Sequence, residues 1–61
     1  MFNCKCLKEF STEDELGNKV IIKEDELCFY AIVYGKYKVS VGVGFAYFSK
    51  DEFFEHFKQV A

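Results

Sequence analysis

The run LCFYAIVY, residues 27–34, is the feature that most constrains the fold of this chain. It is rich in β-branched and aromatic residues and apolar at nearly every position, which is typical of a strand covered on both faces. Gly35 and Lys36 follow it. The next residues alternate, with apolar side chains at Tyr37, Val39, Val41 and Val43. Two such runs around a short glycine-containing turn predict a β-hairpin.

The first of these strands has two apolar faces, because successive side chains of a strand point to opposite sides. One face holds Cys28, Tyr30, Ile32 and Tyr34, and the other holds Leu27, Phe29, Ala31 and Val33. A single short helix can cover only one of them. We therefore expect the other face to be covered by a sheet that curls into a small barrel or by a second subunit, with a homodimer favoured. An open apolar face would instead indicate a binding site.

Shorter patterns predict the other strands. Phe2, Cys4 and Cys6 alternate with polar residues, which predicts a strand over about residues 2–9. The segment STEDELGNK that follows predicts a loop, with a one-turn helix over Thr12–Leu16 as an option. Another strand starts at Val20 and is interrupted by KEDE. Gly44 is expected to bend or end the second hairpin strand, before a short strand FAYF.

The C-terminal segment predicts a helix over Lys50–Gln59. Ser49 and Glu52 form an S-x-x-E capping box, and an apolar stripe repeats at three- and four-residue steps. The stripe consists of Phe53, Phe54, Phe57 and Val60. The predicted fold is thus one α+β domain over residues 1–61: a small antiparallel sheet of 4–5 strands, curled or SH3-like, with one C-terminal helix packed on it.

Composition limits the function classes. The chain has eight lysines, no arginine, ten acidic residues and a net charge of −2. Nucleic-acid binders usually carry a basic stripe and use arginine, so nucleic acid is not the favoured partner. No apolar run approaches the roughly 20 residues of a membrane span. Three cysteines are an odd number, which favours reduced thiols and the cytoplasm over a secreted disulfide scaffold.

One motif points to RNA. Residues 41–48, VGVGFAYF, match four positions of the RNA-recognition octamer: Gly42, Gly44, Phe45 and Phe48. Val41 replaces the basic residue of that octamer and Val43 replaces an aromatic that stacks on a base. The alternative interpretation is that the glycines ease a curved strand.

The sequence predicts no metal, no cofactor and no enzyme. Cys4, Cys6, Cys28 and His56 amount to four soft ligands, but C-x-C is not the usual zinc spacing, and buried cysteines commonly act as small hydrophobes. The chain has one histidine, no nucleophile elbow and no glycine-rich phosphate loop of the right form.

Over nearly its full length the chain resembles a group of small SH3-like β-barrel proteins of phages and mobile elements in Gram-positive bacteria. The resembling segments are CKCLKEF, VIIKEDELCFYAIV, GKYKVSV and YFSKDEFFEHF. Where that group usually has a glycine before the second strand, this chain has Lys23, Glu24 and Asp25, so an open sheet with a helix is the alternative to a barrel. The resemblance implies an accessory phage protein that binds and blocks a host protein, including those of defence systems.

The favoured function is therefore a non-enzymatic protein-binding module, a phage-encoded inhibitor that acts by stoichiometric contact with a protein of the host bacterial cytoplasm. Tyrosine is enriched at protein interfaces and acidic residues can supply charge complementarity. The predicted partner contacts are Tyr34, Tyr37, Tyr47, Glu24, Asp25 and Glu26. The alternatives are a single-stranded nucleic-acid binder that uses Lys38, Phe45 and Tyr47, and a structural homodimer without a catalytic role.

Overall fold

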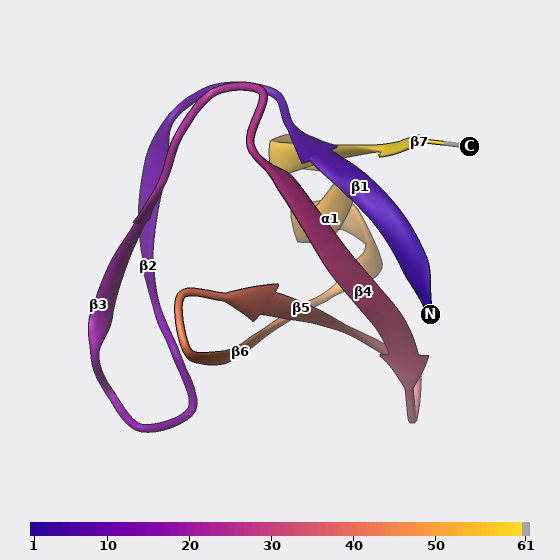
Figure 1. The fold of residues 1–61 in the computed structure, drawn as a ribbon. Helices are drawn as coiled ribbons and strands as arrows, with labels where there is room; N and C mark the ends of the chain where they lie inside the picture. The colour runs from indigo at the N-terminus through magenta and orange to yellow at the C-terminus, as the bar shows by residue number, and fades with distance from the viewer. Residues whose placement is uncertain (61) are drawn as a thin grey trace.

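The computed structural model describes residues 1–60 and contains seven strands and one helix within them. Five strands form one antiparallel sheet in the order β6-β5-β4-β1-β7, and β2 pairs with β3 in a separate hairpin (Figure 1). The elements are β1 Phe2–Cys6, β2 Phe10–Glu13, β3 Lys19–Ile22, β4 Leu27–Val33, β5 Lys36–Val41, β6 Gly44–Phe48, α1 Lys50–His56 and β7 Phe57–Val60. The prediction of a small antiparallel sheet with one helix near the C-terminus is confirmed.

The five-stranded sheet is open. Its edge strands, β6 and β7, do not pair with each other, so the sheet does not close into a barrel within residues 1–60. The β2–β3 hairpin is called the arm below. It leaves the sheet where β1 ends and β4 begins, and its far part lies on the same side of the molecule as the turn between β5 and β6 (Figure 1).

The central hairpin is confirmed. Val33 pairs with Lys36 across a two-residue turn in which Tyr34 and Gly35 both have positive φ, at 49° and 76°. Positive φ at both central residues is the type I′ geometry, whose twist matches that of the flanking strands. Glycine adopts it freely, whereas a tyrosine there is uncommon.

The next turn comes earlier than predicted. Strand β5 ends at Val41, and Gly42, with φ of 56°, starts a tight turn that leads into β6 at Gly44. Val43 is therefore exposed in the turn, and Gly44 begins a strand. Positive φ at the first turn residue alone is typical of a type II′ hairpin, for which glycine is the preferred residue.

The N-terminal half differs from its prediction in two places. The first strand ends at Cys6, and β2 starts at Phe10. The optional helix over Thr12–Leu16 is absent from this segment, because the carboxylate of Asp14 accepts hydrogen bonds from the N–H groups of Leu16 and Asn18, both at 2.9 Å. Such a local turn competes with a helix for the same backbone donors.

The helix begins as predicted and ends three residues early. The Ser49 hydroxyl accepts from the Glu52 N–H at 3.2 Å, and the Glu52 carboxylate accepts from the Ser49 N–H at 2.9 Å, which confirms the capping box. The predicted end at Gln59 is wrong, because residues 57–60 form β7 and pair with the edge of β1. In β7 the backbone N–H and C=O groups of residues 57–60 pair with the otherwise free edge of β1, whereas the carbonyl groups of a last helical turn would have no partner within the helix.

The hydrophobic core lies on one face of the sheet, here called the inner face. Helix α1 and the arm cover this face, and Phe53 lies at its centre with no exposed surface. Its ring centroid is 4.5 Å from that of Tyr37, 4.7 Å from that of Tyr30 and 5.3 Å from that of Phe57. The opposite face has no layer packed over it within the described residues.

Candidate binding surface on the outer face of the sheet

The outer face is defined by cross-strand register, since residues directly opposite each other project to the same side. Lys38 lies opposite Tyr47 on β6 and opposite Ala31 on β4, and Asn3 lies opposite Phe29 and Val60. The largest side chains of this face stay partly open to solvent: Phe29 is 56 % exposed, Tyr47 52 % and Phe45 39 %. Three aromatic rings therefore lie on a sheet face over which no other element of residues 1–60 packs.

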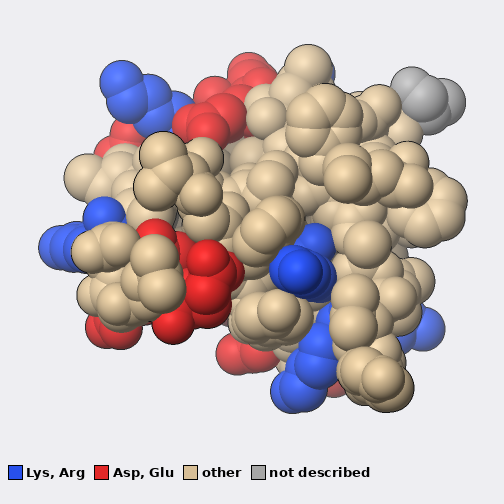
Figure 2. Space-filling model, turned by 60° about the horizontal axis from the view of Figure 1, so that its bottom comes forward, with Lys and Arg blue, Asp and Glu red and all other residues tan. Residues whose placement is uncertain are grey.

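The charges of the five-stranded sheet are of one sign. Within residues 1–60, none of its five strands contains an aspartate or a glutamate. Its lysines are Lys5, Lys36, Lys38 and Lys58, and the register places all four on the outer face. Figure 2 shows a broad uncharged surface with lysines within it, whereas most acidic atoms gather at one side and at the margins. An acidic chain thus carries a basic, aromatic face.

Lys38 links two of the aromatic rings. Its Nζ lies 4.2 Å from the ring centroid of Phe45 and 6.0 Å from that of Tyr47. Phe45 and Tyr47 are alternate residues of β6, about 7 Å apart along the strand. A cation–π contact at an exposed site contributes only about 0.5–1 kcal/mol, so the ammonium group can move to an anionic partner at little cost.

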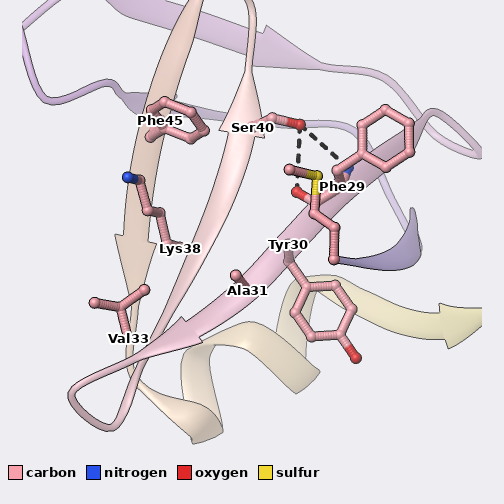
Figure 3. Close-up of a pocket in the computed structure, with 8 residues that line it drawn as sticks. Phe29, Tyr30, Ala31, Val33, Lys38, Ser40 and Phe45 are labelled. Atoms are coloured by element: carbon pink, nitrogen blue, oxygen red, sulfur yellow. Dashed lines mark hydrogen bonds between the residues drawn. The ribbon is translucent and has the colours of Figure 1, made fainter.

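A hollow opens where β4 separates from β5. The backbone pairing of these strands stops at Tyr30 and Val39, and beyond that point the Ser40 hydroxyl takes its place. It accepts from the Phe29 N–H at 3.1 Å and donates to the Phe29 carbonyl at 3.3 Å. The hollow has a volume of about 360 Å³, with Phe29 on one side and Phe45 and Lys38 on the other (Figure 3). Met1, Tyr30, Ala31, Val33 and Ser40 complete its lining.

One carboxylate reaches the margin of this face. Glu15, from the arm, accepts from the Phe45 N–H through Oε2 at 2.6 Å, and its own N–H donates to the Phe45 carbonyl at 2.8 Å. These bonds satisfy the backbone of β6 at its open edge, where an unpaired strand could otherwise recruit another chain. They also hold the ring of Phe45 in place, because the backbone that carries it is fixed on both sides.

The structure does not bring the six predicted partner contacts together. Tyr37 is only 8 % exposed and packs against Phe53, so the prediction that it contacts a partner is not supported by its position. Tyr34 is fully exposed at the tip of the β4–β5 hairpin, and Tyr47 lies on the outer face. Glu24, Asp25 and Glu26 lie in the loop before β4, separated from Tyr34 by the length of that strand, about 23 Å at 3.3 Å per residue.

The residues of the nucleic-acid alternative do come together, since Lys38, Phe45 and Tyr47 share the outer face of β5 and β6. Phe29 and Ser40 were not among the residues predicted from sequence. Phe29 belongs to one of the two apolar faces recognised in the run 27–34, but alternation alone does not tell which face is left open. No local signal marks Ser40, because its role depends on the separation of two strands.

The three thiols belong to the core. Burial raises the pKa of Cys4 to about 12 and that of Cys28 to about 11, and burial also raises the pKa of Cys6. A thiol with such a pKa carries almost no thiolate at neutral pH and is a poor nucleophile or metal ligand. His56 stacks on Phe10 with ring centroids 3.9 Å apart. Among residues 1–60, no three His, Cys, Asp or Glu side chains are placed to share a metal ion.

Comparisons of the chain with protein-family models, with curated proteins and with solved structures gave no match. The part of the chain described here has no helix with the length and apolar character needed to cross a membrane.

Proposed function

We propose that this protein is a non-enzymatic binding module for single-stranded nucleic acid, with the outer face of the sheet as its binding surface. The observation that carries the proposal is the combination on one open face of three half-exposed aromatic rings, four lysines and no acidic residue from the sheet strands of residues 1–60. Unpaired bases stack on aromatic rings, and lysines neutralise the phosphates between them.

The net charge of −2 does not argue against this function, because the charges are segregated. The acidic residues lie in the arm, in the loops before β2 and β4 and in α1, whereas the lysines of the sheet share its outer face. Screening limits the reach of those carboxylates to about 8–10 Å at physiological salt. A polyanion approaching the outer face would therefore meet mainly positive charge.

The test is a fluorescence-anisotropy titration of the protein into a labelled single-stranded oligonucleotide and into a duplex of the same length. We expect binding of the single strand at low salt and little binding of the duplex, whose bases are not free to stack on the sheet. If all four lysines contact phosphates, the logarithm of the binding constant should fall with the logarithm of the salt concentration with a slope of about −3. No binding of any single strand at low salt would refute the proposal.

A second candidate is the phage-encoded inhibitor of a bacterial defence or other host protein, acting by stoichiometric contact in the bacterial cytoplasm. Tyr34 favours it, because a fully exposed aromatic ring occupies a backbone position with φ of 49°. A non-glycine residue in this region costs on the order of 1 kcal/mol, and such strain concentrates at functional sites. The hairpin tip would be the contact. The SH3-like fold implied by the resemblance belongs to this candidate as well.

Replacing Tyr34 with asparagine separates these roles. Asparagine tolerates left-handed backbone and precedes glycine in the preferred type I′ turn, so Tyr34→Asn should stabilise the domain by about 0.5–1 kcal/mol. This gain corresponds to a rise in Tm of roughly 2–8 °C for a domain of this size. Thermal unfolding monitored by circular dichroism measures it, and an unchanged or lower Tm would contradict the strain argument. The inhibitor candidate additionally requires that a host protein retained by wild-type bait be lost with Tyr34→Asn bait, while binding of oligonucleotides is unchanged.

A further inference from the structure

The hollow between Phe29 and Phe45 has the features of a subsite for a planar group. Its two ring walls come from different strands, and the separation of β4 from β5 keeps them apart (Figure 3). Its volume of about 360 Å³ is at the small end of the range of about 300–1,000 Å³ that is typical of ligand pockets. A single ring system fits such a space better than a folded peptide segment does.

We infer that this hollow binds one unpaired nucleobase, with Phe29 and Phe45 contacting its faces or edges and Lys38 contacting the adjoining phosphate. The inference rests on the proposed function and extends it from a surface to a defined position. Charge complementarity selects a nucleotide as the occupant, because the one charged side chain in the lining of the hollow, within residues 1–60, is Lys38.

The position of Lys38 also fixes the direction of the next nucleotide. Its Nζ lies over Phe45 at 4.2 Å and 6.0 Å from the Tyr47 ring, so it stands between the hollow and Tyr47. A phosphate bound there would join one base in the hollow to a second base stacked on Tyr47. The outer face thus accommodates a two-nucleotide step that runs along β6.

The subsite reads shape rather than base identity. Two residues of the lining, Tyr30 and Ser40, carry hydroxyls. The Tyr30 hydroxyl lies on the inner-face side, where it accepts from Gln59 Nε2 at 2.7 Å, and the Ser40 Oγ already accepts from the Phe29 N–H and donates to the Phe29 carbonyl. With its proton committed, the Ser40 hydroxyl is not free to donate to a base edge. Stacking, in contrast, is available to every base, so binding should tolerate a change of sequence.

An abasic scan combined with variants tests the inference. The probe is the shortest single-stranded oligonucleotide that keeps full affinity, with each nucleotide in turn replaced by an abasic sugar. With the wild-type protein we expect about a tenfold loss at one position from the base in the hollow and a second loss at the neighbouring position from the base on Tyr47. With Phe29→Ala, the first loss should become much smaller, because Phe45 is then the one ring of the hollow that still contacts the base. The second loss should remain. Tyr47→Ala should give the reverse pattern.

Matched variants keep the result interpretable. Phe29→Tyr retains the ring and should bind as the wild type does, and Ile21→Ala removes an exposed apolar side chain from the separate arm and should have no effect. Phe29 is more than half exposed, so its replacement should leave the circular-dichroism spectrum unchanged.

Two results would refute the inferred nucleobase subsite while leaving the proposed function intact. One is an equal loss of affinity at all abasic positions, and the other is that the losses of affinity from Phe29→Ala and from the abasic sugar are additive at every position. A wild-type protein that binds no single strand would overturn both. Light scattering tests whether the hollow instead forms an interface between two copies of the protein. If the wild type is a dimer that Phe29→Ala converts to a monomer, and oligonucleotides do not compete with dimerisation, the hollow is an interface between two copies and the inference is wrong.

Discussion

Phe53→Ala is expected to remove about 3–5 kcal/mol from the free energy of unfolding, the usual cost of deleting a buried phenylalanine side chain. Phe53 is completely buried, and its ring lies within 5.3 Å, centroid to centroid, of the rings of Tyr30, Tyr37 and Phe57. A 61-residue domain has a total stability of roughly 3–9 kcal/mol. The variant should therefore lose at least about a third of its stability, which urea titration followed by far-ultraviolet circular dichroism measures.

The adjacent residue is the control for this prediction. Phe54 lies on the same helix and has the same side chain, but it is 40 % exposed. Phe54→Ala makes the same change in helix propensity and loses mainly edge contacts with Phe53 and Tyr37, so we expect a cost of about 1 kcal/mol. Equal shifts of the urea midpoint for the two variants would show that the helix does not pack as described.

The double variant Phe45→Ala/Tyr47→Ala should weaken binding of single-stranded oligonucleotides by at least about 30-fold. Each stacking contact with a base contributes about 1–3 kcal/mol, and both rings belong to the open outer face rather than to the core. The fold should persist, because the inward-facing residues of β6 are Gly44, Ala46 and Phe48, which remain. Anisotropy titrations at one salt concentration give the ratio of affinities.

The salt dependence distinguishes stacking from charge. The aromatic double variant should leave the slope of affinity against salt unchanged, because no phosphate contact is lost. Lys38→Gln should reduce the magnitude of that slope by about 0.7, the value for one phosphate of a single strand. If the double variant binds as tightly as the wild type, the outer face is not the nucleic-acid surface.

Elements whose geometry depends on neighbouring residues could be predicted from the sequence. The capping box joins Ser49 to Glu52 and the hairpin turn joins Val33 to Lys36, in each case three positions apart, so the local residue pattern is sufficient to predict them. The end of the helix could not be predicted in the same way. Phe57 and Val60 continue a helical apolar stripe, but β1 offers these residues an open strand edge 50 or more positions earlier in the chain.

The residues of the candidate site could likewise be predicted only in part, because their exposure depends on residues far away in the chain. The octamer-like segment drew attention to Phe45 and Tyr47, and alternation placed Phe29 on one of two apolar faces. The predicted contact set of Tyr34, Tyr37, Tyr47 and Glu24–Glu26 rests on residue type alone, and its members occupy the core, a hairpin tip, the sheet face and a distant loop. Residue type indicates which contacts a side chain can make, but the packing of its neighbours determines whether the side chain is exposed to a partner.

The sequence by itself determined the strand and helix periodicities, the turns that need glycine and the presence of two apolar faces that a single helix cannot cover. The tertiary structure alone decided which of these faces stays open. The arm and α1 both pack on the inner face, β7 pairs with β1, and the register then gathers Lys5, Lys36, Lys38 and Lys58 with three aromatic rings on the other side. The physical reason is that burial and strand pairing join residues far apart in the chain, and no local pattern carries that information.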